Sequence, residues 1–266
     1  MSYSLKDIGT ARYFLGLEIA RSSSGLFMAQ NKYVMDIIWD TSLCHAKSAA
    51  TPLPRGLKLM VALHVVGYLK GCPSKGLFFP SRNSLALRAY CNADWATCPD
   101  SKRSLTGLCV FLGDALVSWK TKKQSTVYRS TAEAEYCSLA ATVCELRWLS
   151  YILHDLSVSV ILLIDLFCDN KAAVHILANP VFHESTKHIE LDCHLVPDAY
   201  KEGFISPSFV PSSLQLSDVF TKSHLWGADD VLQQPATQLQ QSQQSHSANI
   251  EGSIEDDEDV ELIDAG

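Results

Sequence analysis

The sequence predicts an α/β fold in which a mixed sheet is flanked by helices. Two observations lead to this prediction. Between residues 85 and 121 three strand-like runs follow one another, and from residue 131 onwards helical and strand-like segments alternate. A meander of strands followed by a helix, a strand and a further helix is typical of a mixed α/β sheet.

Composition and length are those of a globular protein. The chain has 266 residues, of which 47% are hydrophobic and 19% are charged. It has no apolar run of about 18 residues, and its N-terminus does not resemble a signal peptide. We therefore expect an intracellular protein, cytoplasmic or nuclear, without a membrane contact. The nine cysteines form no paired framework, and no Cys/His spacing matches a closed tetrahedral zinc site.

The net charge of −7 is unevenly distributed. Residues 227–266 hold ten acidic side chains and no Lys or Arg, so 22 basic and 19 acidic residues remain in positions 1–226. A mildly basic body is compatible with a nucleic-acid partner, although an ordinary protein surface explains it equally well. We expect the Gln/Ser-rich and acidic tail, 227–266, to be disordered.

The N-terminal part predicts a small compact pattern. Residues 13–20 indicate a buried strand, residues 25–30 its hairpin partner, and residues 31–43 an amphipathic helix. A short helical run follows at 61–71 and ends at Gly71.

Residues 85–226 carry the richest pattern. The strands are expected at 85–93, 106–113 and 115–121, with a hairpin turn at Gly113 and Asp114. A long helix, 131–156, begins at a cap formed by Ser130 or Thr131. The apolar run 160–168 indicates a central strand. The remaining elements are expected in the order helix 170–178, helix 184–202, strand 204–210 and helical turn 214–222.

Acidic residues fall at the ends of these elements. Asp169 follows the central strand directly, Glu135 lies one turn into the long helix, and Asp218 lies in the last helical turn. The end of the first strand offers Asn92 and Asp94. Carboxylates that converge repel one another unless divalent cations neutralise them, and Mg²⁺ prefers such oxygen ligands. The spacing therefore makes a magnesium site one possibility, although any α/β domain has acids at strand ends.

Three strings resemble the reverse transcriptase–ribonuclease H part of copia-type retrotransposon Pol polyproteins. They are CNADWATCPDSKRSLTGLCVFLGDALVSWKTKKQSTVYRSTAEAEY (91–136), FCDNKAAVHILANPVFHESTKHIELDCH (167–194) and VPSSLQLSDVFTK (210–222). With the linking residues they cover about 140 positions in the family's order. LKDIGTARYFLGLEIARSSSGLFMAQNKYVMDII (5–38) is similar to the segment that follows the polymerase active site.

The resemblance implies a ribonuclease H-like mixed sheet flanked by helices and four parts of the chain. These are a truncated reverse-transcriptase remnant (1–54), a shortened connection (55–84), the ribonuclease H-like domain (85–226) and the tail (227–266). It also implies hydrolysis of RNA in RNA–DNA hybrids with two Mg²⁺ or Mn²⁺ ions. Glu135, Asp169 and Asp218 match three of the family's four metal ligands.

The chain departs from the family's pattern at the first metal ligand. Where the family has a DADW motif, this chain reads Asn92-Ala93-Asp94-Trp95, so an amide replaces the first aspartate. An amide oxygen can contact a metal but carries no charge, and we expect severe loss of activity. Asp94, two residues on, is an imperfect substitute on the same strand face.

Other departures concern the body of the chain. Pro197 lies inside a helical stretch, where a proline costs about 3 kcal/mol or kinks the helix. The connection is short, and no YxDD motif occurs, so we expect no polymerase activity.

Nucleic-acid contacts are expected from basic residues near the predicted site. The candidates are Lys120, Lys122, Lys123, Arg129 and Lys222. The first four are placed in a loop between the third strand and the long helix, where a solvated surface is the alternative. His188 could assist proton transfer or product release, or lie on a helix surface. Trp95, Trp119 and Trp148 are expected to be core residues rather than base-stacking ones.

Three functions remain as hypotheses at this point. The first is a degenerate ribonuclease H, which cleaves weakly or not at all. The second is a non-catalytic nucleic-acid-binding protein or an inert transposon remnant, without a defined protein partner. The third, an integrase-type transferase on the same fold, is disfavoured because the site residues run in the order Asn, Glu, Asp, Asp along the chain.

Overall fold

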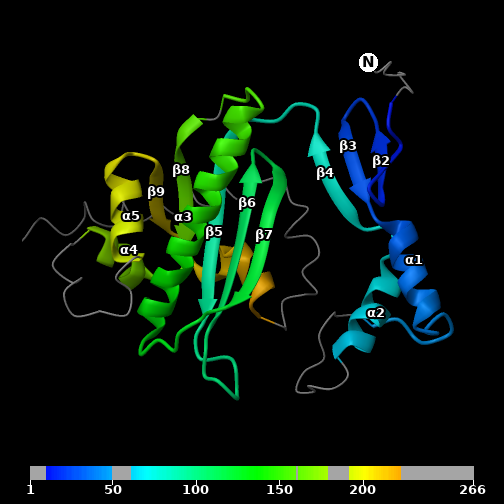
Figure 1. Cartoon of the computed structure of the whole chain (residues 1–266), viewed down its shortest axis with the longest axis horizontal. Helices are drawn as coiled ribbons and strands as arrows, with labels where there is room; N and C mark the ends of the chain where they lie inside the picture. Colours follow the sequence, from blue (N-terminus) through cyan, green and yellow to red (C-terminus); the bar gives the residue numbers. More distant parts are fainter. Residues whose placement is uncertain (1–9, 50–60, 160, 179–191, 223–266) are drawn as a thin grey trace, which may run out of the picture.

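Two sheets lie side by side in the protein (Figure 1). This computed structural model describes residues 10–49, 61–159, 161–178 and 192–222. The larger sheet has five strands in the order β7-β6-β5-β8-β9, and the smaller has four in the order β1-β2-β3-β4. The predicted α/β fold with a mixed sheet and flanking helices is confirmed.

The larger sheet is antiparallel on one side and parallel on the other. Its strands are β5 (Ala86–Asp94), β6 (Leu105–Leu112), β7 (Ala115–Lys123), β8 (Ile161–Cys168) and β9 (Ile205–Phe209). Strands β5, β6 and β7 form the predicted meander, whereas β8 pairs parallel to both β5 and β9. Gly113, with a φ of +58°, occupies the β6–β7 turn as predicted.

Alternate residues of β5 face two separate apolar clusters. Leu87, Ala89 and Cys91 pack against the long helix α3 (Thr131–Asp155), which crosses one face of the sheet (Figure 1). Tyr90 packs on the other face against the short helix η4 (Leu216–Phe220). The central strand is therefore buried on both faces, and both helices have fixed positions relative to its end.

Helix α3 begins where the sequence predicts. The Oγ of Ser130 accepts a hydrogen bond from the backbone N–H of Glu133 at 3.2 Å, so Ser130 rather than Thr131 is the cap. Three further elements complete this part: α4 (Lys171–Ala178), α5 (Asp192–Lys201) and η3 (Ser212–Leu214). The segment predicted as a helical turn at 214–222 is 3₁₀-helical. Pro197 is buried within α5, which remains a helix around it.

The N-terminal prediction of one buried strand at 13–20 is wrong. The segment forms two strands, β1 (Tyr13–Phe14) and β2 (Leu17–Arg21), because Leu15 and Gly16 turn the chain at φ values of +49° and +83°. None of its side chains is buried. Helices α1 (Asn31–Asp40) and α2 (Val61–Gly71) pack against each other at one end of this sheet (Figure 1) and do not cross its face.

One strand of the smaller sheet was not predicted. Strand β4 (Gly76–Pro80) pairs with β3 (Gly25–Ala29), so residues from 55–84 and from 1–54 share one sheet. The predictions for 184–191 and for the tail 227–266 lie outside the described residues. No helix in the described part is long and apolar enough to span a membrane.

Gly107 on β6 permits the close approach of η4 to the sheet. A Cβ at this position would lie 2.6 Å from Cγ2 of Thr221 and 3.0 Å from the carbonyl oxygen of Ser217. We predict that Gly107→Ala displaces η4 and lowers the free energy of unfolding by about 1–3 kcal/mol, measured by urea denaturation. Gly67→Ala is the control, because its Cβ would meet nothing closer than 3.6 Å. Equal stability of both variants would contradict the close packing of η4.

Candidate functional site

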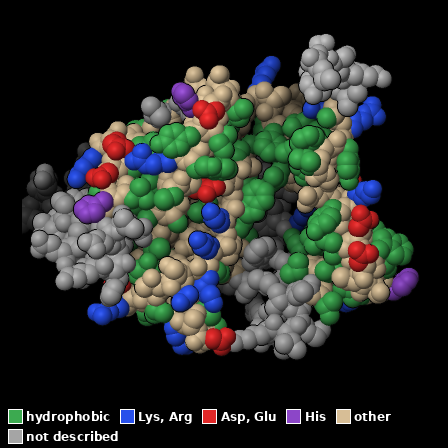
Figure 2. Space-filling model, viewed as in Figure 1, with side chains coloured by type: hydrophobic (Ala, Val, Ile, Leu, Met, Phe, Trp, Pro, Cys, Tyr) green, Lys and Arg blue, Asp and Glu red, His purple; other side chains and the backbone are tan. Residues whose placement is uncertain are grey.

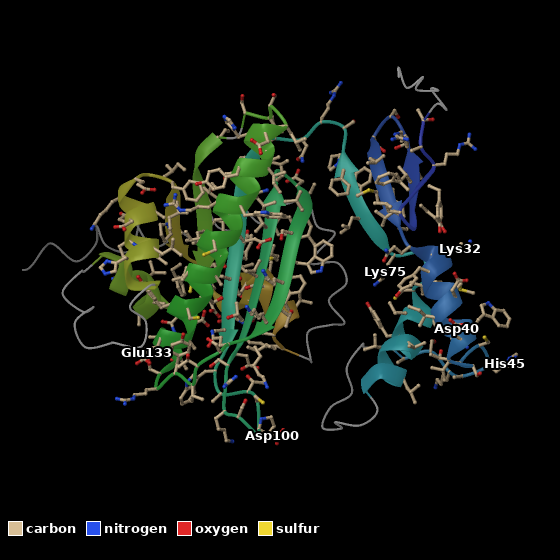
Figure 3. All side chains as sticks on the ribbon, viewed as in Figure 1. Lys32, Asp40, His45, Lys75, Asp100 and Glu133 are labelled. Carbon is tan, nitrogen blue, oxygen red and sulfur yellow. The ribbon has the colours of Figure 1, made fainter. Side chains whose placement is uncertain are left out.

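Four predicted site residues meet at one end of the larger sheet. Asn92 lies near the end of β5, Glu135 in the first turns of α3, Asp169 directly after β8, and Asp218 in η4. Figure 3 shows this end of the domain, with Glu133 in the first turn of α3 and Asp100 in the loop that follows β5. The elements that carry the four residues are those that the sequence predicted.

The side-chain amide of Asn92 donates hydrogen bonds to two residues, Asp218 and Thr221. Its Nδ2 donates to Oδ1 of Asp218 and, at 2.9 Å, to Oγ1 of Thr221. Thr221 in turn donates to the carbonyl oxygen of Asp218 at 3.3 Å. This orients the amide, because the opposite orientation would place its oxygen against the Asp218 carboxylate. Asn92 is 2% exposed, so the contact lies out of bulk water.

Asp218 has a donor on each carboxylate oxygen. Oδ1 receives the amide of Asn92, and Oδ2 receives Nζ of Lys222 at 2.6 Å. Burial raises the pKa of Asp218, the hydrogen bond and charge of Lys222 lower it, and the charges of Asp169 and Asp94 raise it. Asp218 is therefore paired within the protein, and its negative charge is compensated by an ammonium group.

Glu135 is a buried carboxyl group beside the end of β5. Its Oε1 accepts a hydrogen bond from the backbone N–H of Ala93 at 2.9 Å, and the residue is 5% exposed. Burial, above all, raises the pKa of Glu135 to about 9, and the neighbouring Cys168 and Asp169 add to this effect. Without a neighbouring cation this carboxyl group is thus protonated at neutral pH.

Asp169 lies at the more accessible side of the cluster. It is partly exposed, and its Oδ2 accepts a hydrogen bond from Oγ of Ser212 at 2.8 Å. One donor atom each from Asp169, Glu135 and Cys168 lie within 4.8 Å of one another. The carboxylates of Glu135 and Asp169 fit a divalent cation in this position. The pair Asn92–Asp218 differs, because the amide N–H of Asn92 and the ammonium group of Lys222 both point to the Asp218 carboxylate.

Asp94 lies at the last position of β5 and is partly exposed. It is two residues beyond Asn92, on the same face of the strand. Its charge reaches Asp218, whose pKa it raises. Asp94 therefore stands at the margin of the cluster and not in the place of Asn92.

Sequence reasoning did not identify the residues that hold the end of β5 in place. Oγ of Ser138 donates to the carbonyl oxygen of Asn92 at 3.0 Å from the α3 side. Nε2 of Gln215 donates to the carbonyl oxygen of Cys91 at 3.0 Å from the η4 side. Thr221, which accepts from Asn92, was also missed. Ser138, Gln215 and Thr221 are neutral polar residues, which are common in any sequence. The only signal that could have identified them is that each lies within a few positions of a predicted acidic site residue.

The basic residues lie in positions that differ from the prediction. Lys120, Lys122 and Lys123 belong to β7 and not to a loop, because the strand continues to residue 123. Lys120 pairs with Glu145 of α3 at 3.6 Å, and Nζ of Lys123 lies 3.5 Å from Sγ of Cys98. These lysines thus point to two faces of the sheet. Arg129 is exposed just before α3.

Lys and Arg side chains are nevertheless frequent at the lower end of the larger domain in Figure 2, where β5 ends. Lys222 is engaged with Asp218, as described above. His188 lies outside the described residues.

The three tryptophans were expected in the core, and this prediction is wrong. Trp95, Trp119 and Trp148 are 44%, 50% and 55% exposed. Trp95 follows the end of β5, and its Nε1 donates to the carbonyl oxygen of Tyr128 at 3.1 Å. Trp119 lies on β7, at the edge of the sheet, and Trp148 on a part of α3 that faces away from the sheet. The exposure of each tryptophan is thus set by its place on a strand or helix, and the apolar character of the side chain did not predict it.

Similar proteins are found among transposon polyproteins. The chain is 32% identical over 270 residues to the retrovirus-related Pol polyprotein from transposon RE1 of Arabidopsis thaliana, a match that covers 83% of this chain and 18% of that protein. It is 25% identical over 280 residues to the Pol polyprotein from transposon TNT 1-94 of Nicotiana tabacum, covering 83% and 21%. The chain thus spans about a fifth of the length of these curated relatives.

Other comparisons gave weaker matches. No protein-family model matches the chain. Among solved structures, the N-terminal RNase H domain of rv2228c from Mycobacterium tuberculosis is 13% identical, with a TM-score of 0.38, and the match covers 59% of this chain and 99% of that one.

The raised pKa of Glu135 predicts a dependence of stability on pH. Its pKa is about 9 in the folded protein against an ordinary value of 4.5, so the folded state retains a proton that the unfolded state has lost. The unfolding free energy should therefore fall as pH rises between these values, by up to about 1.4 kcal/mol per pH unit from this group. Glu135→Gln should remove that part of the slope in urea denaturation series in metal-free buffer.

Glu133→Gln, two residues earlier on the same helix, is the control for this measurement. Glu133 is only partly buried and should leave the slope unchanged. An identical slope in wild-type protein and in Glu135→Gln would show that Glu135 is already ionised at neutral pH.

Proposed function

The chain belongs to the family of retrovirus-related Pol polyproteins of copia-type transposons, and we propose that residues 85–226 are a ribonuclease H-like domain whose hydrolytic activity is severely impaired or lost. Its ancestral reaction is the hydrolysis of RNA in RNA–DNA hybrids. The observation that supports the loss is the hydrogen bond from the Asn92 amide to Asp218. An aspartate at this position would face another carboxylate and would require a cation between them.

The loss follows from the charge and the geometry of the Asn92–Asp218 pair. Two divalent cations in such a site stabilise the attacking and the leaving oxygen of an in-line phosphoryl displacement. In this chain the side chain of Asn92 donates an N–H to Asp218. An aspartate at the same position would instead present a negatively charged oxygen to a cation. Lys222 occupies the second oxygen of Asp218. The pair is therefore satisfied without a metal ion.

The remaining acids retain part of the ancestral arrangement. Glu135 and Asp169 are close enough to share one Mg²⁺ or Mn²⁺ ion. Asp94 could supply a carboxylate only from the margin of the cluster, because Asn92 and not Asp94 contacts Asp218. One cation held by two carboxylates cannot contact both oxygens that change their bonding in hydrolysis. We infer weak cleavage at most.

A non-catalytic role in nucleic-acid binding is the second candidate. Lys122 on β7 and Arg129 before α3 are exposed, and Lys and Arg side chains are frequent at this end of the domain (Figure 2). Basic side chains bind phosphates by electrostatic attraction and displace counterions. The partner we propose is an RNA–DNA hybrid or another nucleic acid.

We predict that Asn92→Asp restores cleavage of a labelled RNA–DNA hybrid in Mg²⁺ by about 100-fold or more over the wild-type chain. The new carboxylate faces Asp218 and recreates the need for a cation at this position. In metal-free buffer the same variant should be less stable than wild type, because two carboxylates then repel each other, and Mg²⁺ should restore its thermal midpoint.

The double variant Asn92→Asp/Glu135→Gln serves as the inactive control. Metal-dependent cleavage by the wild-type chain that Glu135→Gln abolishes, at a rate close to that of Asn92→Asp, would contradict the proposed loss of activity. If Asn92→Asp becomes metal-dependent in stability but does not cleave, the cause of inactivity lies elsewhere in the fold, and the proposed role of Asn92 is wrong.

Removal of exposed basic residues should weaken hybrid binding. We predict that Lys122→Gln/Arg129→Gln lowers the affinity in fluorescence anisotropy and reduces the slope of log affinity against log salt by about one per phosphate contact removed. Lys75→Gln, in the N-terminal part of the chain, is the control. Equal salt slopes for all three proteins would exclude Lys122 and Arg129 from the binding surface.

A further inference from the structure

The last five residues of β7, 119–123, form an exposed part of the sheet edge. Strand β7 is the outer strand in the order β7-β6-β5-β8-β9, and all five residues are exposed. Side chains of a strand alternate between its two faces. Thr121 donates to the carbonyl oxygen of Phe220 at 3.0 Å, so Trp119, Thr121 and Lys123 lie on the face that carries η4. This face therefore presents an exposed indole ring and an exposed ammonium group beside η4.

The loop between β5 and β6 adds basic side chains next to Lys123. Sγ of Cys98 lies 3.5 Å from Nζ of Lys123, and the backbone N–H of Cys98 donates to the carbonyl oxygen of Arg103 at 3.1 Å. Lys102 and Arg103 are exposed, as is the one acid of this loop, Asp100, which is labelled in Figure 3. Within the described part of the chain, none of Lys102, Arg103 and Lys123 forms an ion pair. These three residues, here called the basic surface, therefore offer their charges to an anionic partner.

The last described residue, Lys222, lies close to the basic surface. It follows Phe220 by two positions, and Phe220 accepts the hydrogen bond of Thr121. Lys123 lies two residues, or roughly 7 Å, beyond Thr121 along β7. Residues 223–250 are 28 positions long, and a random coil of that length spans roughly 30 Å. The segment that follows residue 250 is therefore within reach of the basic surface, at an effective concentration on the order of millimolar.

Residues 251–266 carry the opposite charge. They include eight Asp and Glu residues and no Lys or Arg, and five of the acids are consecutive at 255–259. Four apolar side chains stand among the acids: Ile254, Val260, Leu262 and Ile263. Carboxylates complement the charges of the basic surface, and apolar side chains complement the ring of Trp119, which is 50% exposed on the same face. Segment 251–266 thus matches both kinds of side chain that this end of β7 presents.

We propose that segment 251–266 binds the basic surface of its own chain and competes there with nucleic acid. The competition rests on the nucleic-acid binding proposed above, whereas the contact itself does not. A run of carboxylates attracts Lys and Arg side chains as a row of phosphates does, and salt weakens both interactions. Asp94, on β5 and on the same face of the sheet, repels a polyanion. The contact is therefore confined to the β7 side of η4, where Lys123 belongs to the residues expected to bind nucleic acid.

Zero-length cross-linking with a carbodiimide tests the contact without nucleic acid. The reagent joins a carboxyl group to an amine only where the two groups touch. In dilute full-length protein we expect cross-links within one chain from segment 251–266 to Lys102 or Lys123. They should disappear at about 1 M salt, where the Debye length falls to about 3 Å.

Lys201 is the matched control for the cross-linking. It is also exposed, but it ends α5, which lies on the other side of the larger sheet from β7 (Figure 1). Cross-links to Lys201 as frequent as those to Lys102 and Lys123, or none to these two lysines, would overturn the inference. Cross-links found only between two chains would assign the basic surface to a second copy and would overturn it as well.

A full-length chain with a less acidic segment tests the competition. Its five consecutive acids are changed to the matching amides: Glu255→Gln, Asp256→Asn, Asp257→Asn, Glu258→Gln and Asp259→Asn. In fluorescence anisotropy at about 50 mM salt, we expect this variant to bind a labelled RNA–DNA hybrid about tenfold more tightly than the wild type does, because an intramolecular competitor has been removed. The difference should vanish as the salt concentration rises.

A second background separates a local contact from a general effect of net charge. In the triple variant Lys102→Gln/Arg103→Gln/Lys123→Gln, the same five changes should alter the affinity by less than about twofold, because the segment has lost its binding surface. Equal gains in affinity in both backgrounds would overturn the proposed competition. If no variant binds the hybrid while cross-links to Lys102 or Lys123 form, the proposed nucleic-acid binding and the competition are wrong, and the contact within the chain is confirmed.

Discussion

The amide of Asn92 donates one hydrogen to Asp218 and the other to Thr221, and the end of the larger sheet is arranged around this contact. The amide joins β5 to η4, which lies close against Gly107 of β6. With Lys222 on its other oxygen, Asp218 is satisfied by the protein alone. We propose that these direct hydrogen bonds replace a cation that would otherwise join β5 to η4, and that the site has lost one negative charge in the exchange.

The two halves of the acidic cluster consequently differ in what they can bind. On the η4 face of the sheet, Asp218 accepts a hydrogen bond from the amide of Asn92, and the ammonium group of Lys222 compensates its charge. On the α3 face, Glu135 is buried, lacks a basic partner among the described residues and shares its surroundings with Cys168 and Asp169. Burial of a carboxyl group next to a second acid raises its pKa, and Glu135 shows this effect. The α3 face therefore holds a protonated carboxyl group beside Asp169, whereas the η4 face holds an ion pair.

Much of the fold could be predicted because periodicity and turns are local properties of the sequence. The meander, the start of α3 at Ser130 or Thr131 and the strand before Asp169 follow from alternation, capping and apolar runs. Strand β4 was missed because pairing with a strand about 50 residues earlier leaves no local pattern. The exposure of Trp119 likewise depends on which strand lies at the sheet edge. In the site, the acids could be predicted because they stand at the ends of elements. Ser138 and Thr221 could not, because their hydrogen bonds to Asn92 join elements that are distant in the sequence.

The most direct test of this account is to locate a cation in crystals of the wild-type chain and of Asn92→Asp, both soaked in Mn²⁺, by anomalous scattering. The account predicts no ion between Asn92 and Asp218 in the wild type and an ion between the two carboxylates in the variant. A Mn²⁺ ion coordinated by Oδ1 of Asn92 and by Asp218 in the wild-type crystal would show that the amide turns its oxygen to the metal. That result would contradict the claim that a hydrogen bond has replaced the cation.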